Sequence, residues 1–256
     1  MKKRTKIIAT LGPASTTGPK IEKMMNAGAD VFRINLSHTN IDQAKGIISL
    51  VRSKESQLGR PVGIMLDLQG QKVRIKGLSG KPFVNLKANN KFIINPSLDE
   101  KGNQKEVGVT FKDLYKNVKP DDELLLSDAL IKLKVISIKK NKIITNVERG
   151  GKLKPYQGLN KKGGGLSLSG ITTKDKNDLK KSLTLEYDYV AISFVKDDKD
   201  INEVKKILKN KDIRIIAKIE RNEAIKNIDK ITKLADGLLV ARGDLGVEIG
   251  IEQLPS

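Results

Sequence analysis

Residues Ile213 to Gly250 read IRIIAKIERNEAIKNIDKITKLADGLLVARGDLGVEIG, and this stretch decides the fold. Its beginning, 213–217, is an apolar run typical of a strand. Apolar residues then recur at helical spacing between Ile225 and Leu234, and a second apolar run follows at 238–241. Strand, helix and strand in this order form a βαβ unit, which predicts neighbouring parallel strands.

Charged residues follow both predicted strands. Lys218 and Glu220 are two residues apart, so on a strand their side chains share one face. Arg242, Gly243 and Asp244 follow the second run. Because parallel strands end at the same edge of a sheet, we expect Glu220 and Asp244 to converge on one hard cation, with Lys218 beside them. The alternative is a surface ion pair between Lys218 and Glu220, which is common and weak.

The composition narrows the class of protein. The chain has 256 residues, enough for one large domain or two small ones, and 38% of them are hydrophobic. It has no cysteine, which excludes disulfides and thiolate metal ligands. No apolar run approaches the roughly 20 residues that span a bilayer, and the apolar stretch near the amino terminus is too short for a signal peptide. We therefore expect a cytoplasmic protein without a membrane partner.

The net charge of +19 raises the possibility of nucleic-acid binding. The lysines are scattered, however, and the aromatic residues, 4% of the chain, are not interleaved with them. We expect no nucleic-acid partner. A positive field of this kind also attracts phosphorylated metabolites.

The first part of the chain alternates between apolar strands and amphipathic helices. Strands are predicted at 6–11, 31–34 and 62–66, with helices after Pro19 and at 41–53. Short apolar strands in this order are typical of a buried parallel sheet.

The pattern changes after Gln71. Short alternating runs indicate strands at 91–94, 123–126, 131–138 and 142–147, and residues 139–141 predict a hairpin turn between the last two. We interpret this region as a small β-barrel domain inserted after the third strand. Its end, Gly163 to Gly165, is predicted to be a flexible hinge.

The α/β alternation then returns, with a helix at 174–183, a strand at 189–192 that ends in Ser193, and a helix at 198–208. About six strand–helix units are present, whereas a closed (β/α) barrel has eight strands. The predicted fold is an α/β fold, an incomplete TIM-type barrel. Its predicted domains are 1–70 (first part of the barrel), 71–168 (inserted β domain) and 169–256 (second part).

Several motifs occur in order along the chain: KIIATLGPAS, MMNAGADVFRINLSHT, GIMLDLQGQKVR, EYDYVAISFVKD, IIAKIERNEAIKNIDKI and DGLLVARGDLGVEI. In these motifs the sequence resembles the pyruvate kinase family across essentially its whole length. The resemblance implies transfer of the phosphoryl group of phosphoenolpyruvate to ADP, giving ATP, followed by protonation of the enolate to pyruvate, a step of glycolysis. It also implies a barrel that is interrupted after its third strand.

The resemblance assigns roles to the charged residues. Glu220 and Asp244 would bind Mg²⁺ as hard oxygen ligands. Lys218 would stabilise charge on the phosphoryl group and on the enolate. Arg33 would hold the transferring phosphate, with Arg74 nearby. Chemistry of this type depends mainly on positioning and charge neutralisation.

Further substrate contacts follow from the same resemblance. Asp244 and the backbone of Arg242 and Gly243 would contact the substrate, the backbone holding its carboxylate, and Ser193 is a further substrate-binding candidate. Asn35 and His38 match positions near the nucleotide phosphates, as does Arg33.

For three of these residues, the alternative is a purely structural role. Arg33 and Asp67 could pair inside the barrel mouth without contacting substrate. Ser193 could be a strand-end hydrogen-bonding residue. His38 is the only histidine, and we do not assign proton transfer to it.

The sequence departs from the family at its monovalent-cation site. Pyruvate kinases that need K⁺ hold the ion at positions that match Asn35, Ser37, Asp67 and Leu68. A nearby Glu of those enzymes is replaced here by Lys72, so we expect that K⁺ is not required. The alternative is that Lys72 points into solvent and the pocket is lost.

The last barrel strands and the carboxyl-terminal domain of the family, which supports its homotetramer, have no counterpart in these 256 residues. Two hypotheses follow: a pyruvate kinase, or a catalytically incompetent truncated barrel that retains only Mg²⁺ and phosphoenolpyruvate binding. A weaker third is another Mg²⁺-dependent barrel, which the β insertion and RINLSH motif disfavour. We expect the 256-residue polypeptide alone to be nearly inactive and marginally stable.

Overall fold

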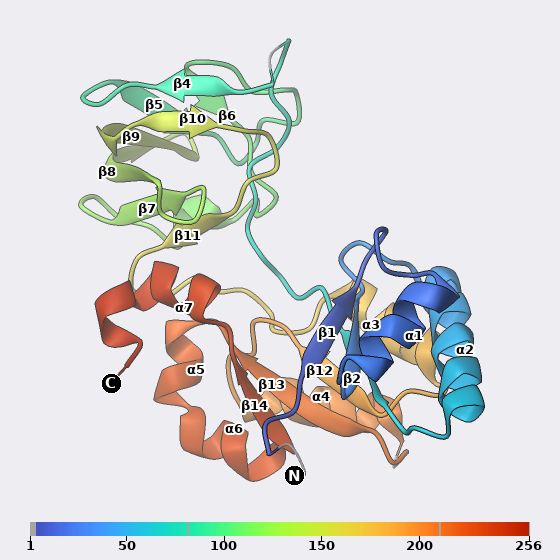
Figure 1. Ribbon diagram of the computed structural model, residues 1–256. Helices are drawn as coiled ribbons and strands as arrows, with labels where there is room; N and C mark the ends of the chain where they lie inside the picture. Colours follow the sequence, from blue (N-terminus) through green and yellow to red (C-terminus); the bar gives the residue numbers. More distant parts are fainter. Residues whose placement is uncertain (1–3, 81, 210, 256) are drawn as a thin grey trace. The chain divides into compact units, whose positions relative to one another are not determined.

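The computed structural model describes residues 4–80, 82–209 and 211–255 (Figure 1). The chain divides into two compact units, each formed by segments that are distant in sequence. The first unit contains the residues up to Gln71 together with Ser169–Ile219 and Asn227–Leu239. The second contains Lys72–Leu168, Glu220–Lys226 and the residues from Val240 onward. Residues 1–3 and 256, at the ends of the predicted domains 1–70 and 169–256, lie outside the described residues.

The first unit is built on a six-stranded sheet in the order β1-β2-β3-β12-β13-β14. Its strands are β1 (Ile8–Leu11), β2 (Val31–Asn35), β3 (Gly63–Asp67), β12 (Tyr189–Ile192), β13 (Arg214–Ile219) and β14 (Gly237–Val240). The pairs from β1 to β13 are all parallel. The chain therefore has an α/β fold with a half-barrel parallel sheet, which confirms the α/β part of the predicted fold class.

Helices connect these strands: α1 (Gly18–Asn26), α2 (Ile41–Leu58), α3 (Thr173–Ser182), α4 (Asp198–Leu208) and α6 (Ile228–Leu234). Along the chain, each helix packs against the next, from α1 to α4 and then α6. No helix in the described part of the chain combines the length and apolar character needed to cross a bilayer.

Helix α2 begins as predicted but is longer than the predicted 41–53. Asn40 and Gln43 form a reciprocal capping box that fixes its start. The apolar stripe stops at Val51, and the helix continues through polar residues until Gly59, whose φ of 59° provides the left-handed cap. The prediction relied on the apolar stripe and therefore ended at residue 53 a helix that continues to Leu58.

The central strands of the first unit are buried on both faces. In β3, Ile64, Met65 and Leu66 are each at most 3% exposed. Strands of this kind leave no side chain free for chemistry along their length. Polar side chains therefore gather at the strand ends, where Asp67, Ser193 and Lys218 are buried.

The second unit contains a sheet in the order β11-β7-β8-β9-β5-β6, which is antiparallel except for the β5–β6 pair, and a two-stranded sheet β10-β4. The strands are β4 (Val84–Leu86), β5 (Lys91–Ile94), β6 (Glu106–Val107), β7 (Glu123–Leu126), β8 (Ile131–Lys139), β9 (Lys142–Arg149), β10 (Gly151–Leu153) and β11 (Leu159–Lys161). The four strands predicted here are present.

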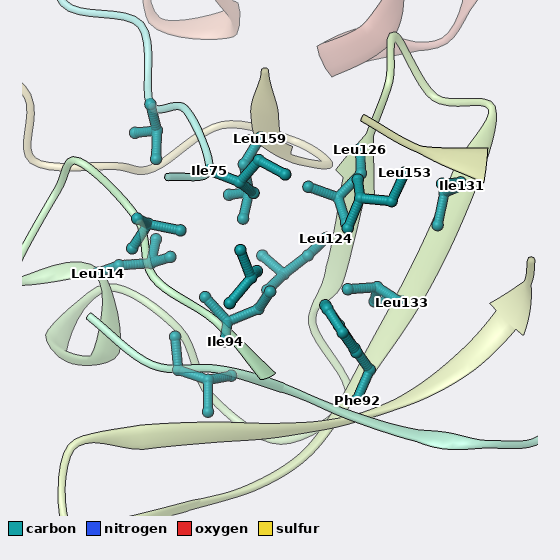
Figure 2. Close-up of a cluster of buried hydrophobic side chains, with 14 of the residues drawn as sticks. Ile75, Phe92, Ile94, Leu114, Leu124, Leu126, Ile131, Leu133, Leu153 and Leu159 are labelled. Atoms are coloured by element: carbon teal, nitrogen blue, oxygen red, sulfur yellow. The ribbon is translucent and has the colours of Figure 1, made fainter. Parts of the chain in front are cut away.

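Alternating side chains of these strands form a continuous apolar core. Figure 2 shows its members from several strands pointing toward one another: Ile75, Phe92, Ile94, Leu114, Leu124, Leu126, Ile131, Leu133, Leu153 and Leu159. The β8–β9 hairpin closes at Lys140 and Asn141, with φ of 47° and 64°. Two positive φ values are the signature of the turn that matches strand twist, so the predicted hairpin is confirmed.

The second unit also contains α5 (Asn222–Lys226), α7 (Arg242–Ile249) and the 3₁₀ turns η1 (Leu114–Lys116) and η2 (Ile251–Gln253). One prediction needs correction here. The helical pattern from Ile225 to Leu234 is not one helix, because it breaks at Asn227 into α5 and α6. Arg242 and Asp244 follow the second strand as predicted, and they form the first turn of α7.

Candidate active site

A single carboxylate, Asp67 at the end of β3, organises the polar residues of the first unit. It is 1% exposed. Arg33 from β2 donates to it through Nε at 2.8 Å and also through Nη2. The third guanidinium nitrogen, Nη1, donates to the Thr10 hydroxyl at 2.8 Å. This fork geometry fixes the plane of the guanidinium. The structural alternative, an Arg33–Asp67 pair, is therefore present, and Arg33 keeps a quarter of its side chain exposed.

Lys218 and Ser193 complete this group. The Lys218 ammonium lies 3.3 Å from Asp67 Oδ1 and donates to Ser193 Oγ at 2.8 Å. Ser193 Oγ in turn donates to Asp67 at 3.2 Å. The structure thus brings Arg33, Ser193 and Lys218 together around Asp67. Two cations share one carboxylate, so the cluster carries net positive charge and suits an anionic ligand.

Gly70 supports the position of Ser193, a relation that the sequence analysis missed. Its φ is +64°, and a Cβ there would lie 2.8 Å from both the carbonyl oxygen and the Cβ of Ser193. The N–H groups of Gln69 and Gly70 donate to Asp175 at 3.0 and 3.3 Å. Only glycine fits this close approach without displacing Ser193.

The end of β2 and the loop after it carry Asn35, Ser37 and His38, and the end of β3 and the position after it carry Asp67 and Leu68, which complete the predicted K⁺ residues. Asn35 Oδ1 accepts from the Ser37 N–H at 2.9 Å, and the His38 N–H donates to the Asn35 carbonyl at 3.1 Å. Leu68 is buried, at 1% exposed. These residues lie in the first unit with Asp67, and the structure holds them through backbone hydrogen bonds.

Glu220 and Asp244 belong to the second unit. Glu220 follows β13 and is 2% exposed. Asp244 Oδ1 accepts from Lys72 Nζ at 2.5 Å, and Asp128 lies 3.8 Å from the same ammonium. Lys72 is 18% exposed at its side chain, so the alternative in which it points into solvent is wrong. Arg74, also in this unit, donates to the Tyr156 carbonyl at 3.0 Å.

The first turn of α7 leaves space for a ligand. Apart from its chain neighbours and the backbone of its own helix, no described residue has an atom within 4 Å of the position that a Cβ on Gly243 would take. A ligand could approach the backbone of Arg242 and Gly243 at this point, as a carboxylate contact requires.

A second group of charged residues was not anticipated from the sequence: Arg221 and Glu248, which are buried, and Glu223, which is half-buried. Arg221 is 2% exposed and donates to both oxygens of Glu223, each at 3.2 Å. Burial raises the Glu223 pKa, but the charge of Arg221 and backbone donors outweigh it and hold that pKa below its ordinary value. Burial raises the pKa of Glu248. The four-residue spacing of Asp244 and Glu248 was the available signal, because it places both on one helical face.

Glu220 and Asp244 are the candidate magnesium ligands of the second unit. Among the described residues, no three His, Cys, Asp or Glu side chains form a metal-binding group. Mg²⁺ is commonly held by only one or two carboxylates, with water and substrate phosphates supplying the other oxygens. Glu220 and Asp244 provide hard oxygen ligands of that kind, so the chemistry of the residues present fits the ion.

Comparison with known proteins decides the family. The family model described as "Pyruvate kinase, barrel domain" matches residues 2–256. The chain belongs to the pyruvate kinase family. It is 40% identical to pyruvate kinase II of Salmonella typhimurium over 98% of this chain and 54% of that protein. It is 43% identical to the pyruvate kinase of Buchnera aphidicola subsp. Baizongia pistaciae and 40% to that of Haemophilus influenzae, with the same coverage.

The chain thus spans about half the length of the pyruvate kinases that it matches. The family assignment confirms the resemblance found in the motifs.

Proposed function

We propose that this chain carries the catalytic barrel of a pyruvate kinase, which transfers the phosphoryl group of phosphoenolpyruvate to ADP. The observation that supports this most is the pair of cations, Arg33 and Lys218, held on Asp67 at the strand ends. A phosphoryl group in transfer carries charge on its oxygens, and fixed cations stabilise it without reorganisation.

In this proposal each residue has a defined task. An oxygen of the ADP β-phosphate attacks phosphorus, and the bond from phosphorus to the enol oxygen breaks. Arg33 holds the phosphoryl oxygens, and Lys218 neutralises charge on them and on the enolate that remains. A proton then adds to the enolate carbon, which gives pyruvate.

Glu220 and Asp244 would hold Mg²⁺, which supplies charge neutralisation between substrate and phosphate when it is bound. The backbone at Arg242 and Gly243 would bind the substrate carboxylate, helped by Ser193. Asn35 and His38 would contact the nucleotide, and Arg74 would assist Arg33. A cytoplasmic location belongs to the same proposal, since glycolysis supplies the substrate.

The domain organisation is also proposed. Residues 1–70 and 169–256 would form parts of a TIM-type barrel, and 71–168 an inserted β-barrel domain. The many β strands of the second unit support this division.

A further part of the proposal is that K⁺ is not required. Lys72 is ion-paired with Asp244 inside the second unit, which supports a fixed ammonium in place of a mobile cation. The residues Asn35, Ser37, Asp67 and Leu68 would then form a pocket that needs no monovalent ion.

The second candidate is a truncated barrel that binds Mg²⁺ and phosphoenolpyruvate without turnover. The chain covers 54% of pyruvate kinase II of Salmonella typhimurium, and this partial coverage supports the second candidate. A coupled assay of pyruvate release by the purified 256-residue polypeptide, together with calorimetric titration of phosphoenolpyruvate in Mg²⁺, separates the two. Turnover establishes the enzyme, binding without turnover establishes the second candidate, and the absence of both contradicts each.

A further inference from the structure

Glu248 joins several segments of the second unit through hydrogen bonds, one of them to the Asn160 side chain. It lies in α7 and is 6% exposed. Its carboxylate accepts from the backbone N–H of Asn222 at 3.0 Å. Its own carbonyl accepts from the Gly163 N–H at 2.9 Å. A buried carboxylate is costly unless its hydrogen bonds are made, so the position is specified by these partners.

The spacing of these contacts links two segments that carry the proposed metal ligands. Asn222 is two residues after Glu220, at the start of α5. Glu248 is four residues after Asp244, one turn further along α7. The hydrogen bond from the Asn222 N–H to Glu248 therefore ties the segment that follows Glu220 to the helix that holds Asp244.

The segment after Glu220 is itself anchored. Arg221 donates to the Leu166 carbonyl at 2.9 Å and to Glu223. Glu223 also accepts from the Gly165 N–H at 2.7 Å, and the Asn222 side chain donates to the Gly163 carbonyl at 2.8 Å. Hydrogen bonds thus hold Gly163 and Gly165, the two ends of the run that was predicted to be a flexible hinge. Because this frame is fixed, a loss at Glu248 would move α7 rather than be absorbed by the loop.

We propose that Glu248 is a positioning residue that sets the separation of the Glu220 and Asp244 carboxylates, and thereby the affinity for the divalent cation. This inference rests on the proposed function, because it takes these two carboxylates as the metal ligands. Glu248 acts through the Asn222 hydrogen bond and does not touch the reacting groups.

A pure charge effect and a pure stability effect of Glu248 would give different results from a positioning role. If Glu248 only contributed negative charge near the cation, any neutral replacement would weaken binding equally. If it only stabilised the fold, its loss would lower the melting temperature without changing the cation affinity of the folded protein. A hydrogen-bond role requires that replacements differ according to whether they retain an acceptor.

The test measures Mn²⁺ binding to the 256-residue polypeptide by electron paramagnetic resonance, with no assay of turnover. Glu248→Gln keeps an acceptor oxygen but loses the charge, whereas Glu248→Leu loses both. We expect Glu248→Leu to weaken Mn²⁺ binding by about 10–100-fold, the range typical of groups that orient metal ligands. Glu248→Gln should stay within about threefold of the parent. Equal weakening by both variants overturns the proposal, as does no weakening by either.

A second pair of variants tests the same hydrogen bond from its donor. Asn222→Pro removes the N–H at a first helical position, where proline is tolerated. Asn222→Ala is the matched control, because it loses the side-chain bond to Gly163 but keeps the N–H. We expect Mn²⁺ binding to fall by about tenfold or more in Asn222→Pro relative to Asn222→Ala. Equal affinities would overturn the proposal even if the Glu248→Leu variant failed to fold.

Failure of the proposed function is distinguishable in the same experiment. Glu220→Gln should lower Mn²⁺ affinity if Glu220 is a ligand, and Glu186→Gln, an exposed carboxylate change, should not. If the parent binds no Mn²⁺, or Glu220→Gln has no effect, the metal assignment itself is wrong. If Glu220→Gln weakens Mn²⁺ binding but Glu248→Gln and Glu248→Leu bind Mn²⁺ equally well, only the positioning role of Glu248 is wrong.

Discussion

The two units use buried charge in opposite ways. In the first, one carboxylate, Asp67, holds two cations, Arg33 and Lys218. In the second, carboxylates predominate: Glu223 is paired with Arg221, whereas Glu248 accepts a backbone N–H. A centre with surplus cations attracts phosphate, and a centre with surplus carboxylates attracts a metal ion. A reaction that transfers a phosphoryl group with a divalent ion needs both.

The largest expected effect is at the cation-rich centre. Lys218→Met removes the buried ammonium and leaves Arg33 on Asp67. Loss of one fixed group that stabilises transition-state charge typically costs about 10²–10³-fold in turnover. We expect a loss of that size in pyruvate release, or weaker phosphoenolpyruvate binding by calorimetry if the polypeptide does not turn over.

The matched control is Lys176→Met, which removes an ammonium from an exposed pair with Glu203. Its effect on both measurements should be small. Similar losses in the two variants would show that overall positive charge, and not the Asp67 centre, binds the substrate.

The second effect concerns stability. Asp67→Asn leaves two cations with a neutral partner in a buried site. Removing one partner of a buried ion pair costs about 3–5 kcal/mol, and we expect the lower end because Arg33 is partly exposed. The free energy of unfolding in urea measures this. Glu203→Gln, in the exposed pair, should cost at most about 1 kcal/mol, and an equal cost for Asp67→Asn would contradict the picture of a buried charge centre.

Much of the fold was predictable because apolar runs between turn residues mark strands. β12 and α4 have the predicted bounds, and β5 and β7 do also. The pattern failed where tertiary contacts decide. The break at Asn227 interrupts a regular helical pattern, and α7 follows β14 without a polar linker that would signal a new element.

The candidate site was predictable only in its strand-end residues. Arg33 and Lys218 lie near the ends of β2 and β13, and Ser193 directly follows β12, so parallel pairing brings them to one edge of the sheet. The residues that hold these side chains in place could not be recognised from a sequence pattern. The role of Gly70 depends on its distance from Ser193, and the contact of Glu248 depends on a backbone N–H of Asn222, which the sequence does not display.

A third, smaller effect is expected at Lys72, the cation that is paired with Asp244 in the second unit. Lys72→Glu replaces the ammonium on Asp244 with a like charge. In a full-length version of the enzyme, we expect activity in K⁺-free buffer to fall about tenfold, equivalent to about 1.4 kcal/mol, and to recover in part with KCl. Lys72→Met should lose activity without recovery, since it adds no carboxylate. Strong K⁺ activation of the parent enzyme would show that Lys72 does not replace the ion.

The smallest effect distinguishes the two acidic residues within the second unit. Burial raises the Glu248 pKa, so its stabilising contribution is complete below the unfolded value, about 4.3, and is lost as the pH rises through the folded value. The Glu223 pKa is lowered, because Arg221 and backbone donors outweigh its burial. Its contribution is present above the unfolded value and is lost as the pH falls through the folded one.

The melting temperatures of Glu223→Gln and Glu248→Gln, each compared with the parent from pH 3 to 8, should therefore change in opposite directions. The deficit of Glu223→Gln should grow as the pH rises, because the neutral side chain gives up the pairing with Arg221. The deficit of Glu248→Gln should shrink, because the variant avoids an ionised buried carboxylate. The two variants change the net charge equally, so each controls for the other. Parallel curves would mean that net charge alone governs this unit, and that burial does not raise the pKa of Glu248.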